Sequence, residues 1–253
     1  MLNDEQLLQY SRHLLLPEVD AAGQEAWLNA KVLIVGLGGL GSPVALYLAS
    51  AGVGELVLVD DDRVELSNLQ RQVIHTHQRL GEFKVESAQA QIAQINPNTQ
   101  VSVITDRLEG ELLQDTVRNV DLVVDCTDNF QTRHALNKTC FEAAKPLVSG
   151  AAIRFEGQVS VYDPRHPETP CYQCLYPADA NVDQNCSTSG VFAPLVGMVG
   201  TIQAAESLKV LANIGDVLEG RLLLIDAKTM QFQTLKLAKR ATCEICGTGR
   251  KSN

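Results

Sequence analysis

The sequence lacks an excess of positive charge, and this removes the simplest basis for nucleic-acid binding. Its 253 residues include 21 Lys and Arg against 30 Asp and Glu, a formal net charge of −9. Such a chain has no general electrostatic attraction for a phosphate backbone. We also find no internal repeat and no low-complexity tract. With 45% hydrophobic and 20% charged residues, the composition is that of a globular protein, which excludes disordered, collagen-like and coiled-coil classes.

The N-terminus lacks the basic and apolar stretches of a secretory signal peptide. We therefore expect a cytoplasmic protein, where thiols stay reduced. Its seven cysteines are then metal ligands, nucleophiles or core residues rather than disulfides. Two uncharged runs, residues 32–54 and 185–205, are interrupted by glycine, proline or polar residues. We interpret both runs as buried core and not as membrane spans.

Short runs of Val, Ile and Leu alternate with helical stretches through the first 150 residues. Strands are expected over residues 32–35, 56–59, 101–104, 122–124 and 147–148, with helices over residues 40–50, 84–95, 111–117 and 130–143. Apolar strands separated by helical crossovers predict a parallel sheet covered on both faces. A helical segment, residues 1–29, precedes them, with Pro17 as a breaker. Its expected apolar anchors are Leu7, Leu8, Leu14, Leu15 and Leu16.

The pattern changes after Gly150. Strands expected over residues 158–163, 222–226 and 232–237 would extend the same sheet, and an apolar helix should run from Pro194 to about Asn213. Residues 176–189 are polar and predict a long mobile loop. We thus expect an α/β, Rossmann-like fold in which antiparallel C-terminal strands extend a parallel N-terminal part. Residues 1–253 would form a single domain, divided into segments 1–29, 30–150 and 151–253.

A glycine-rich turn follows the first expected strand and opens the next helix. It satisfies the pattern G-x-G-x-x-G, in the order Gly36-Leu37-Gly38-Gly39-Leu40-Gly41. Glycine is needed because the backbone turns tightly and phosphate approaches without a Cβ in the way. The helix N-terminus offers N–H groups and a positive dipole end to the anion. Asp60 ends the second strand, where an acidic residue commonly binds ribose hydroxyls. The alternative is a turn that binds nothing, but strand, helix and acid together favour a nucleotide site.

Two cations beyond Asp60 favour ATP over a dinucleotide. Arg71 lies in the polar stretch that comprises residues 67–72, and Lys84 begins the next helical stretch. Fixed positive charges suit a triphosphate and its departing pyrophosphate. Each cation could instead be an ordinary solvated charge. Their position after Asp60 favours the functional interpretation.

A third polar group follows the strand expected over residues 122–124, in the order Asp125-Cys126-Thr127-Asp128-Asn129. Ligands bind α/β sheets at the carboxyl ends of parallel strands. Asp128 is suited to hold Mg²⁺ against phosphates. The alternative, compatible with the first, is that Asp128 caps the helix that begins near Phe130. Cys126 and Cys140 are expected to be small buried residues.

Two C-x-x-C pairs predict a metal site. They are Cys171 with Cys174 and Cys243 with Cys246. Four thiolates in two turn-forming pairs match a closed tetrahedral Zn²⁺ site, which has no position for a reactive water and is therefore structural. Redox disulfides are the alternative for either pair alone. The remaining cysteine, Cys186, lies in a polar loop and is either an accident of composition or a sulfur-handling nucleophile.

Together, these residues resemble the MoeB/ThiF (HesA/MoeB/ThiF) family of adenylyltransferases, which is related to the ubiquitin-activating enzymes. The matching segments are residues 10–13, 36–41, 67–72, 84, 125–129, 149–152 and both C-x-x-C pairs. The resemblance implies adenylation of the C-terminal glycine of a ubiquitin-like sulfur carrier protein ending in Gly-Gly, with release of pyrophosphate. The residues that would bind ATP are Gly36, Gly38, Gly39, Gly41, Asp60, Ser67, Asn68, Leu69, Gln70, Arg71, Lys84, Asp128 and Asn129.

The same resemblance implies a role for each charged residue. Arg71 and Lys84 would stabilise the phosphate charge that moves in the transition state, and Asp128 would hold Mg²⁺. Arg12 would reach the ATP of the neighbouring subunit, which implies a homodimer; its alternative is an ordinary surface charge. Residues 151–253 would bind the carrier and the zinc ion.

The sequence has features of two branches of this family. Residues 149–154 resemble the molybdopterin-synthase activating branch, which we take as the first hypothesis. Residues 185–188 are more similar to the thiamine branch, in which the loop cysteine, here Cys186, takes part in sulfur transfer. The chain ends soon after Cys246, without the rhodanese domain of some relatives. We therefore expect a separate sulfur donor protein.

Two other classes of function compete with adenylation. An NAD-dependent dehydrogenase would use the same glycine turn, but the sequence offers no evident general acid for hydride chemistry. His75, His77 and His134 are more simply interpreted as polar surface or helix residues. The other rival is a non-catalytic binding module stabilised by zinc.

Overall fold

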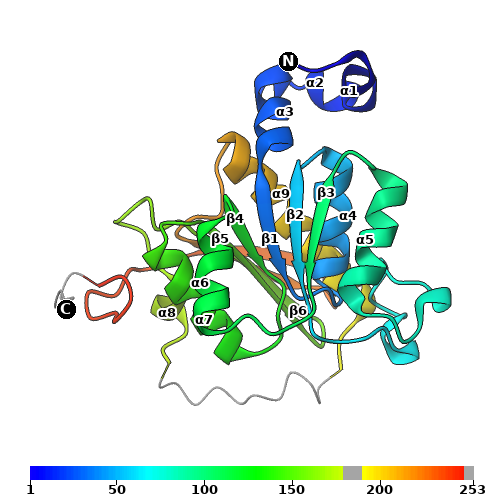
Figure 1. Cartoon of the computed structure of the whole chain (residues 1–253). Helices are drawn as coiled ribbons and strands as arrows, with labels where there is room; N and C mark the ends of the chain where they lie inside the picture. The colour runs from blue at the N-terminus through cyan, green and yellow to red at the C-terminus, as the bar shows by residue number, and fades with distance from the viewer. Residues whose placement is uncertain (179–189, 248–253) are drawn as a thin grey trace.

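The structure is a computed structural model that describes residues 1–178 and 190–247 (Figure 1). In these ranges an eight-stranded sheet runs in the order β3-β2-β1-β4-β5-β6-β7-β8. Its strands are β1 (Lys31–Val35), β2 (Glu55–Val59), β3 (Gln100–Ile104), β4 (Leu122–Asp125), β5 (Leu147–Ile153), β6 (Glu156–Tyr162), β7 (Arg221–Asp226) and β8 (Gln231–Lys236). Strands β1 to β5 pair in parallel, and β6 to β8 add antiparallel strands at one edge. The predicted fold class is confirmed.

Strand β5 is longer than the apolar pattern predicts. It was expected only over residues 147–148, yet it continues to Ile153 and pairs with β6 along its whole length. Its second half contains Gly150, Ala151 and Ala152, which have a low intrinsic preference for strands. The hydrogen bonds of the antiparallel pair outweigh that preference, because tertiary context overrides strand propensity.

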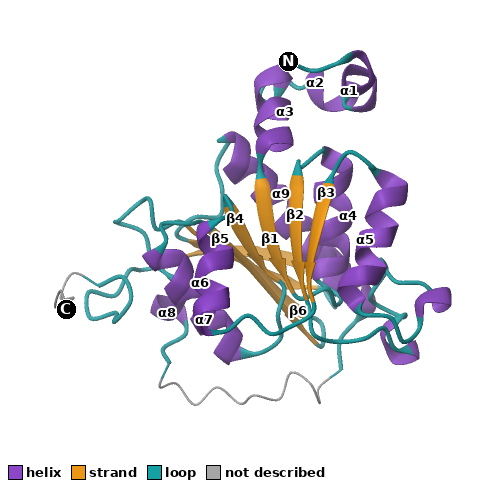
Figure 2. Ribbon diagram, in the orientation of Figure 1, coloured by secondary structure: helices purple, strands orange, loops and turns teal. Residues whose placement is uncertain are grey.

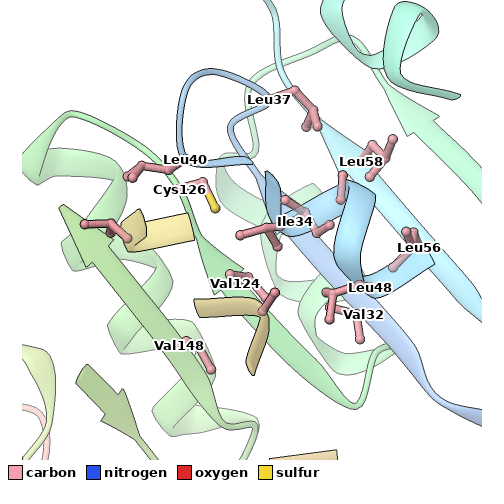
Figure 3. Packing of buried hydrophobic residues seen from close by; sticks show 14 of the residues in the cluster. Val32, Ile34, Leu37, Leu40, Leu48, Leu56, Leu58, Val124, Cys126 and Val148 are labelled. Atoms are coloured by element: carbon pink, nitrogen blue, oxygen red, sulfur yellow. The ribbon is translucent and has the colours of Figure 1, made fainter. Parts of the chain in front are cut away.

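Two layers of helices cover the sheet (Figure 2). On one face, α4 (Gly41–Ala51), α5 (Lys84–Ile95) and α9 (Ala193–Ala212) enclose a core whose side chains are shown in Figure 3. On the other face lie α6 (Gly110–Arg118), α7 (Phe130–Glu142) and the short α8 (Tyr172–Leu175). Within β1, Val32 and Ile34 face the first layer while Leu33 and Val35 face the second. Continuous apolar strands are therefore buried on both sides, as expected for a parallel sheet.

Helix α9 is long and apolar enough to cross a membrane by length and composition. In the structure it packs against α4 and against the sheet at β5 and β6. Leu195 and Val199 are completely buried there, in the same core as α4. The helix is therefore part of the protein core, as the sequence interpretation expected for this apolar run.

The N-terminal helices are anchored differently from the prediction. They are α1 (Asp4–Gln9), α2 (Ser11–Leu14) and α3 (Asp20–Asn29). Of the five leucines expected as anchors, Leu14 is partly exposed and the other four are exposed, so that prediction was wrong. The anchors are aromatic: the hydroxyl of Tyr10 accepts a hydrogen bond from Asn96 at 2.9 Å, and Trp27 Nε1 donates to the Leu208 carbonyl at 2.9 Å. Their polar tips find partners inside the fold, which a leucine cannot do.

Candidate functional site

The glycine turn lies at the carboxyl end of β1, against the end of β4. Gly36 has a φ of +93°, and a Cβ on it would lie 2.8 Å from the Cys126 carbonyl oxygen. A Cβ on Gly41 would lie 1.9 Å from the carbonyl oxygen of Gly36. Glycine is therefore required at both positions by backbone contact within the fold. The turn and the start of α4 lie at the carboxyl ends of the parallel strands, where backbone N–H groups of the glycine turn can face an anion.

Asp60 lies beneath this turn, at the end of β2. Its Oδ2 accepts a hydrogen bond from the Leu37 N–H at 2.6 Å, and its Oδ1 accepts one from the Asp62 N–H at 2.9 Å. Burial raises the pKa of Asp60, although Lys84 and these backbone donors oppose the rise. The carboxylate thus braces the glycine turn, in addition to any contact it makes with a ribose.

Lys84 is the buried cation of the site. At the first turn of α5 its Nζ lies 2.7 Å from Asp62 Oδ2 and 3.8 Å from Asp60 Oδ1. The sequence interpretation did not identify Asp62 as a partner of Lys84, because Asp62 is one of several consecutive acidic residues after β2. Arg71, by contrast, lies nearer the surface and donates from Nη1 to the Ser67 carbonyl at 3.2 Å. The two predicted cations therefore differ: Lys84 is held by carboxylates, whereas Arg71 contacts a backbone carbonyl.

Gln72 adds an unsatisfied polar atom beside the glycine turn. The residue is 4% exposed, and its Oε1 has no hydrogen-bond partner in the described part of the protein. Its Nε2 lies 3.5 Å from the position that a Cβ on Gly38 would occupy. Buried polar groups are usually paired, so an unpaired acceptor at this point fits a site that binds a polar ligand or an ordered water.

The polar group after β4 is held in place by hydrogen bonds. Asp125 is fully buried and accepts hydrogen bonds from the hydroxyls of Thr127 and Ser149, at 2.7 and 3.0 Å. The N-cap of α7 is Asn129, whose side chain accepts from the Thr132 N–H at 2.9 Å. The alternative that Asp128 caps this helix was therefore wrong. Asp128 is exposed at the mouth of the site, where a carboxylate can meet a cation.

Two buried polar residues of the site escaped the sequence interpretation. Gln203, on the otherwise apolar α9, donates from Nε2 to the Asp125 carbonyl at 2.8 Å and is completely buried. A glutamine within such a helix was the signal that could have found it. His75 was assigned to the surface or a helix, but it is 5% exposed and lies outside any helix. It contacts the glycine turn through the Leu37 carbonyl.

The two C-x-x-C pairs lie close together in the structure, although they are far apart in the sequence. All four are buried, and their Sγ atoms lie within 4.8 Å of one another. Cys171 and Cys243, 72 residues apart, have Sγ atoms 3.7 Å apart, and the Sγ atoms of Cys174 and Cys246 are 3.3 Å apart. A disulfide bond measures about 2.05 Å, so none of these pairs is bonded. Tetrahedral Zn²⁺ at about 2.3 Å from each sulfur requires separations near 3.8 Å, which the cluster approaches.

The surroundings of the cluster favour a bound cation. Burial raises the pKa of Cys171 to about 11, and the neighbouring thiols add to the rise. Burial has the same tendency at Cys243, but N–H groups of Cys246 and Ile245 lower its pKa to about 7. Asn137 Nδ2 lies 3.7 Å from Cys171 Sγ, and the Arg240 N–H lies 3.4 Å from Cys174 Sγ, so both can donate to thiolates. A divalent cation would allow all four thiols to ionise together.

Four of the predicted residues remain to be placed: Arg12, Cys126, Cys140 and Cys186. Arg12 is exposed on α2, and α1 to α3 lie where β1 begins, at the opposite end of the sheet from the glycine turn (Figure 1). Arg12 therefore does not belong to the nucleotide site of its own chain. Cys186 and most of the predicted mobile loop, residues 179–189, lie outside the described residues. Cys126 and Cys140 are buried, as predicted.

Fold and site define an α/β protein with a glycine turn at the carboxyl end of β1 and a separate four-cysteine cluster. The model of the ThiF family matches residues 10–245. A molybdopterin-synthase adenylyltransferase of Salmonella typhimurium is 45% identical over 97% of this chain and 98% of its own length. A sulfur carrier protein ThiS adenylyltransferase of Escherichia coli is 44% identical over 97% of each chain. A structure of Escherichia coli MccB with ATP superposes with a TM-score of 0.83 at 26% identity, covering 97% of this chain and 75% of the other.

The chain belongs to the ThiF family, and it is an adenylyltransferase. The resemblance drawn from the sequence is thereby confirmed. The dehydrogenase and the non-catalytic module, weighed as rivals, find no support among these relatives.

Proposed function

We propose that the protein uses ATP to adenylate the C-terminal glycine of a ubiquitin-like sulfur carrier protein, releasing pyrophosphate. The observation that carries the proposal is the glycine turn at the carboxyl end of β1, with Lys84 and Asp60 fixed beside it. Relatives of about 45% identity across almost the whole chain are named for this reaction on a sulfur carrier or molybdopterin synthase. Escherichia coli MccB, which has the same fold and is 26% identical, has been crystallised with ATP.

The reaction needs mainly positioning and electrostatic stabilisation. The backbone N–H groups of the glycine turn would face the phosphates, and Asp60 would meet the ribose as well as bracing the turn. The carrier carboxylate attacks the α-phosphorus, and the bond to the bridging oxygen of pyrophosphate breaks. Lys84 and Arg71 would offset the charge that develops on the leaving pyrophosphate. The looser attachment of Arg71 suits a group that must follow this charge, whereas Lys84 is held in place by carboxylates.

Asp128 and Asn129 would complete the site from the end of β4. Asp128 is exposed and would hold Mg²⁺ against the phosphates, while Asn129 is fixed as the N-cap of α7. Residues 67–70 would contact the nucleotide from the opposite side. Because Arg12 lies at the other end of the sheet, it would act on the ATP of a partner subunit, which requires a homodimer.

We infer that the carrier belongs to molybdopterin cofactor biosynthesis, with the thiamine carrier as the second candidate. Relatives named for molybdopterin synthase are 45% to 48% identical, and the one named for the thiamine carrier is 44% identical. In either case, residues 151–253 would form the carrier-binding part, a separate protein would donate the sulfur, and the reaction would take place in the cytoplasm. Cys186 would serve in sulfur transfer only in the thiamine-type reaction.

The cysteine cluster would hold one structural Zn²⁺ ion through Cys171, Cys174, Cys243 and Cys246. When bound, the ion supplies no reactive water, because four thiolates complete its tetrahedral shell. Its role would be to fasten residues 238–247 to α8 and α7.

The decisive experiment is carrier-dependent exchange of labelled pyrophosphate into ATP. The purified protein is mixed with Mg²⁺, ATP and either the molybdopterin-synthase small subunit or the thiamine carrier, and adenylated carrier is detected by mass spectrometry. We expect exchange with one of them, and loss of exchange in Lys84→Ala. A tight complex with a nicotinamide cofactor and no ATP turnover would overturn the proposal. Unchanged exchange in Arg71→Ala or Asp128→Ala would remove the roles given to those residues.

A further inference from the structure

The side chain of His75 joins two parts of the nucleotide site that are remote in sequence. Its Nε2 lies 2.9 Å from the carbonyl oxygen of Leu37 in the glycine turn. Its Nδ1 lies 2.9 Å from Ser87 Oγ, on the first turn of α5 that also carries Lys84. The imidazole is 5% exposed and Ser87 is completely buried. Both contacts are therefore shielded from competing water.

The chemistry of the partners fixes the tautomer of this imidazole. A carbonyl oxygen accepts hydrogen bonds and never donates them, so Nε2 of His75 must carry the proton. In the neutral ring Nδ1 is then an acceptor, and the Ser87 hydroxyl donates to it. Burial lowers the pKa of His75, and the positive charge of Lys84 adds to this effect, so the ring is neutral near pH 7. The hydroxyl of Ser87 thereby orients the ring toward the turn.

Leu37 is held on three sides as a result. Its N–H donates to Asp60 at 2.6 Å, its carbonyl accepts from His75, and its side chain is completely buried in the core shown in Figure 3. The carbonyl of Leu37 and the N–H of Gly38 belong to one planar trans peptide unit, so they point in opposite directions. Holding the carbonyl toward His75 therefore sets the direction of the Gly38 N–H.

We propose that His75 is a positioning residue for adenylation, which fixes the glycine turn at a set distance from the helix that carries Lys84. The proposal rests on the proposed function, in which this turn and Lys84 bind the triphosphate of ATP. His75 touches no substrate in this role. It prepares the backbone N–H groups of the turn and the ammonium group of Lys84 as one rigid receptor before ATP arrives, which reduces the ordering required on binding.

Two substitutions of similar size separate the two contacts of the imidazole. In His75→Gln the amide reaches as far as Nε2 and keeps a donor for the Leu37 carbonyl. In His75→Asn the shorter amide reaches only the region of Nδ1, so it keeps the contact with Ser87 and leaves the carbonyl without a donor. Both replace a buried ring by a buried amide, so each serves as the control for the other.

The measurement is steady-state carrier-dependent exchange with ATP and carrier varied separately. We expect the KM for ATP in His75→Asn to rise about tenfold, the usual penalty of one orphaned buried acceptor. In His75→Gln it should stay within about twofold of the natural protein, and the KM for the carrier should be unchanged in both. A general loss of folding would change both KM values or reduce only the active fraction. Equal KM values for ATP in the two variants would overturn the proposal.

A second measurement needs no variant. Nitrogen-15 NMR of the histidine rings in the natural protein reports which ring nitrogen carries the proton. We expect His75 to show the Nε2–H tautomer near pH 7, because the Leu37 carbonyl can only accept the hydrogen bond that joins it to Nε2. An Nδ1–H ring in the natural protein would overturn the proposal. If the natural protein shows this tautomer but neither binds nor turns over ATP, the proposed function fails first, and this inference fails with it.

Discussion

The glycine turn and the cysteine cluster are built on opposite plans. The turn is a continuous stretch between β1 and α4, and its geometry depends on backbone contacts within that stretch and with the end of β4. The cluster joins two C-x-x-C pairs that lie 72 residues apart in the sequence, so its cysteines meet only through the tertiary fold. A compact motif is therefore built mainly from one segment, whereas a divided motif depends on the fold to bring its two halves together.

This comparison is tested most strongly by removing the Zn²⁺ ion proposed for the cluster. Chelation of Zn²⁺, or Cys243→Ser, should release residues 238–247 and loosen α8, because about 10 kcal/mol or more of metal-binding free energy holds such sites. The amides of β1, β2 and β4 should keep their protection, since their core shares no residue with the cluster. Hydrogen exchange measured by mass spectrometry checks both statements. Loss of protection in β1 would show that the cluster supports the whole sheet.

The glycine turn should not tolerate a larger residue at Gly41, where the backbone is packed most tightly. In Gly41→Ala the new methyl group would overlap the Gly36 carbonyl, since the two atoms would be 1.9 Å apart. We expect a loss of about 3 kcal/mol in the free energy of unfolding, measured in urea, and loss of pyrophosphate exchange. The matched control is Gly38→Ala, where the nearest atom would be 3.5 Å away and belongs to the side chain of Gln72. Equal stability of the two variants would contradict the steric argument.

Asn137 provides a finer test of the cluster. From α7 it faces Cys171 Sγ through Nδ2, and its Oδ1 accepts from the Tyr172 N–H at 2.9 Å. Asn137→Ala should weaken zinc retention about tenfold, because outer residues that hydrogen-bond to metal ligands contribute at this level. Zinc release to a chromogenic chelator gives the readout. The control is Lys138→Ala, which removes an exposed side chain from the same helix and should leave zinc retention unchanged.

The smallest expected effect is a dependence of stability on pH. The pKa of His75 in the folded protein lies below its ordinary value of 6.5, so the unfolded chain binds the proton more readily in that range. As the pH falls below about 6.5, His75 therefore costs stability, by at most about 1.4 kcal/mol per pH unit. Urea unfolding of the natural protein and of His75→Gln between pH 5.5 and 7.5 should show a steeper slope for the natural protein. Parallel curves would contradict the lowered pKa.

Much of the site was predictable because its signals are local. The order of strand, glycine turn, helix and acid was confirmed at residues 31–60, and α5 begins and ends as predicted. The sequence interpretation missed side chains that contact residues of other secondary-structure elements. Nothing near His75 in sequence indicates Leu37 or Ser87 as partners, and Asp62 appeared as one of several acids. The prediction that leucines anchor residues 1–29 was wrong for a related reason. The hydrophobicity of a side chain does not show whether the fold provides a surface for it to pack against.

By itself, the sequence determined the α/β class, the glycine turn and the four cysteines that form the cluster, because strand periodicity, the lack of a Cβ and thiol chemistry are properties of short segments. The tertiary structure decided which groups meet: His75 with the glycine turn, Gln203 with the end of β4, and Asn129 rather than Asp128 at the start of α7. It also placed Arg12 at the opposite end of the sheet from the nucleotide site of its own chain. Such meetings depend on long-range packing, in which a buried polar group takes whatever partner the fold brings within hydrogen-bonding distance.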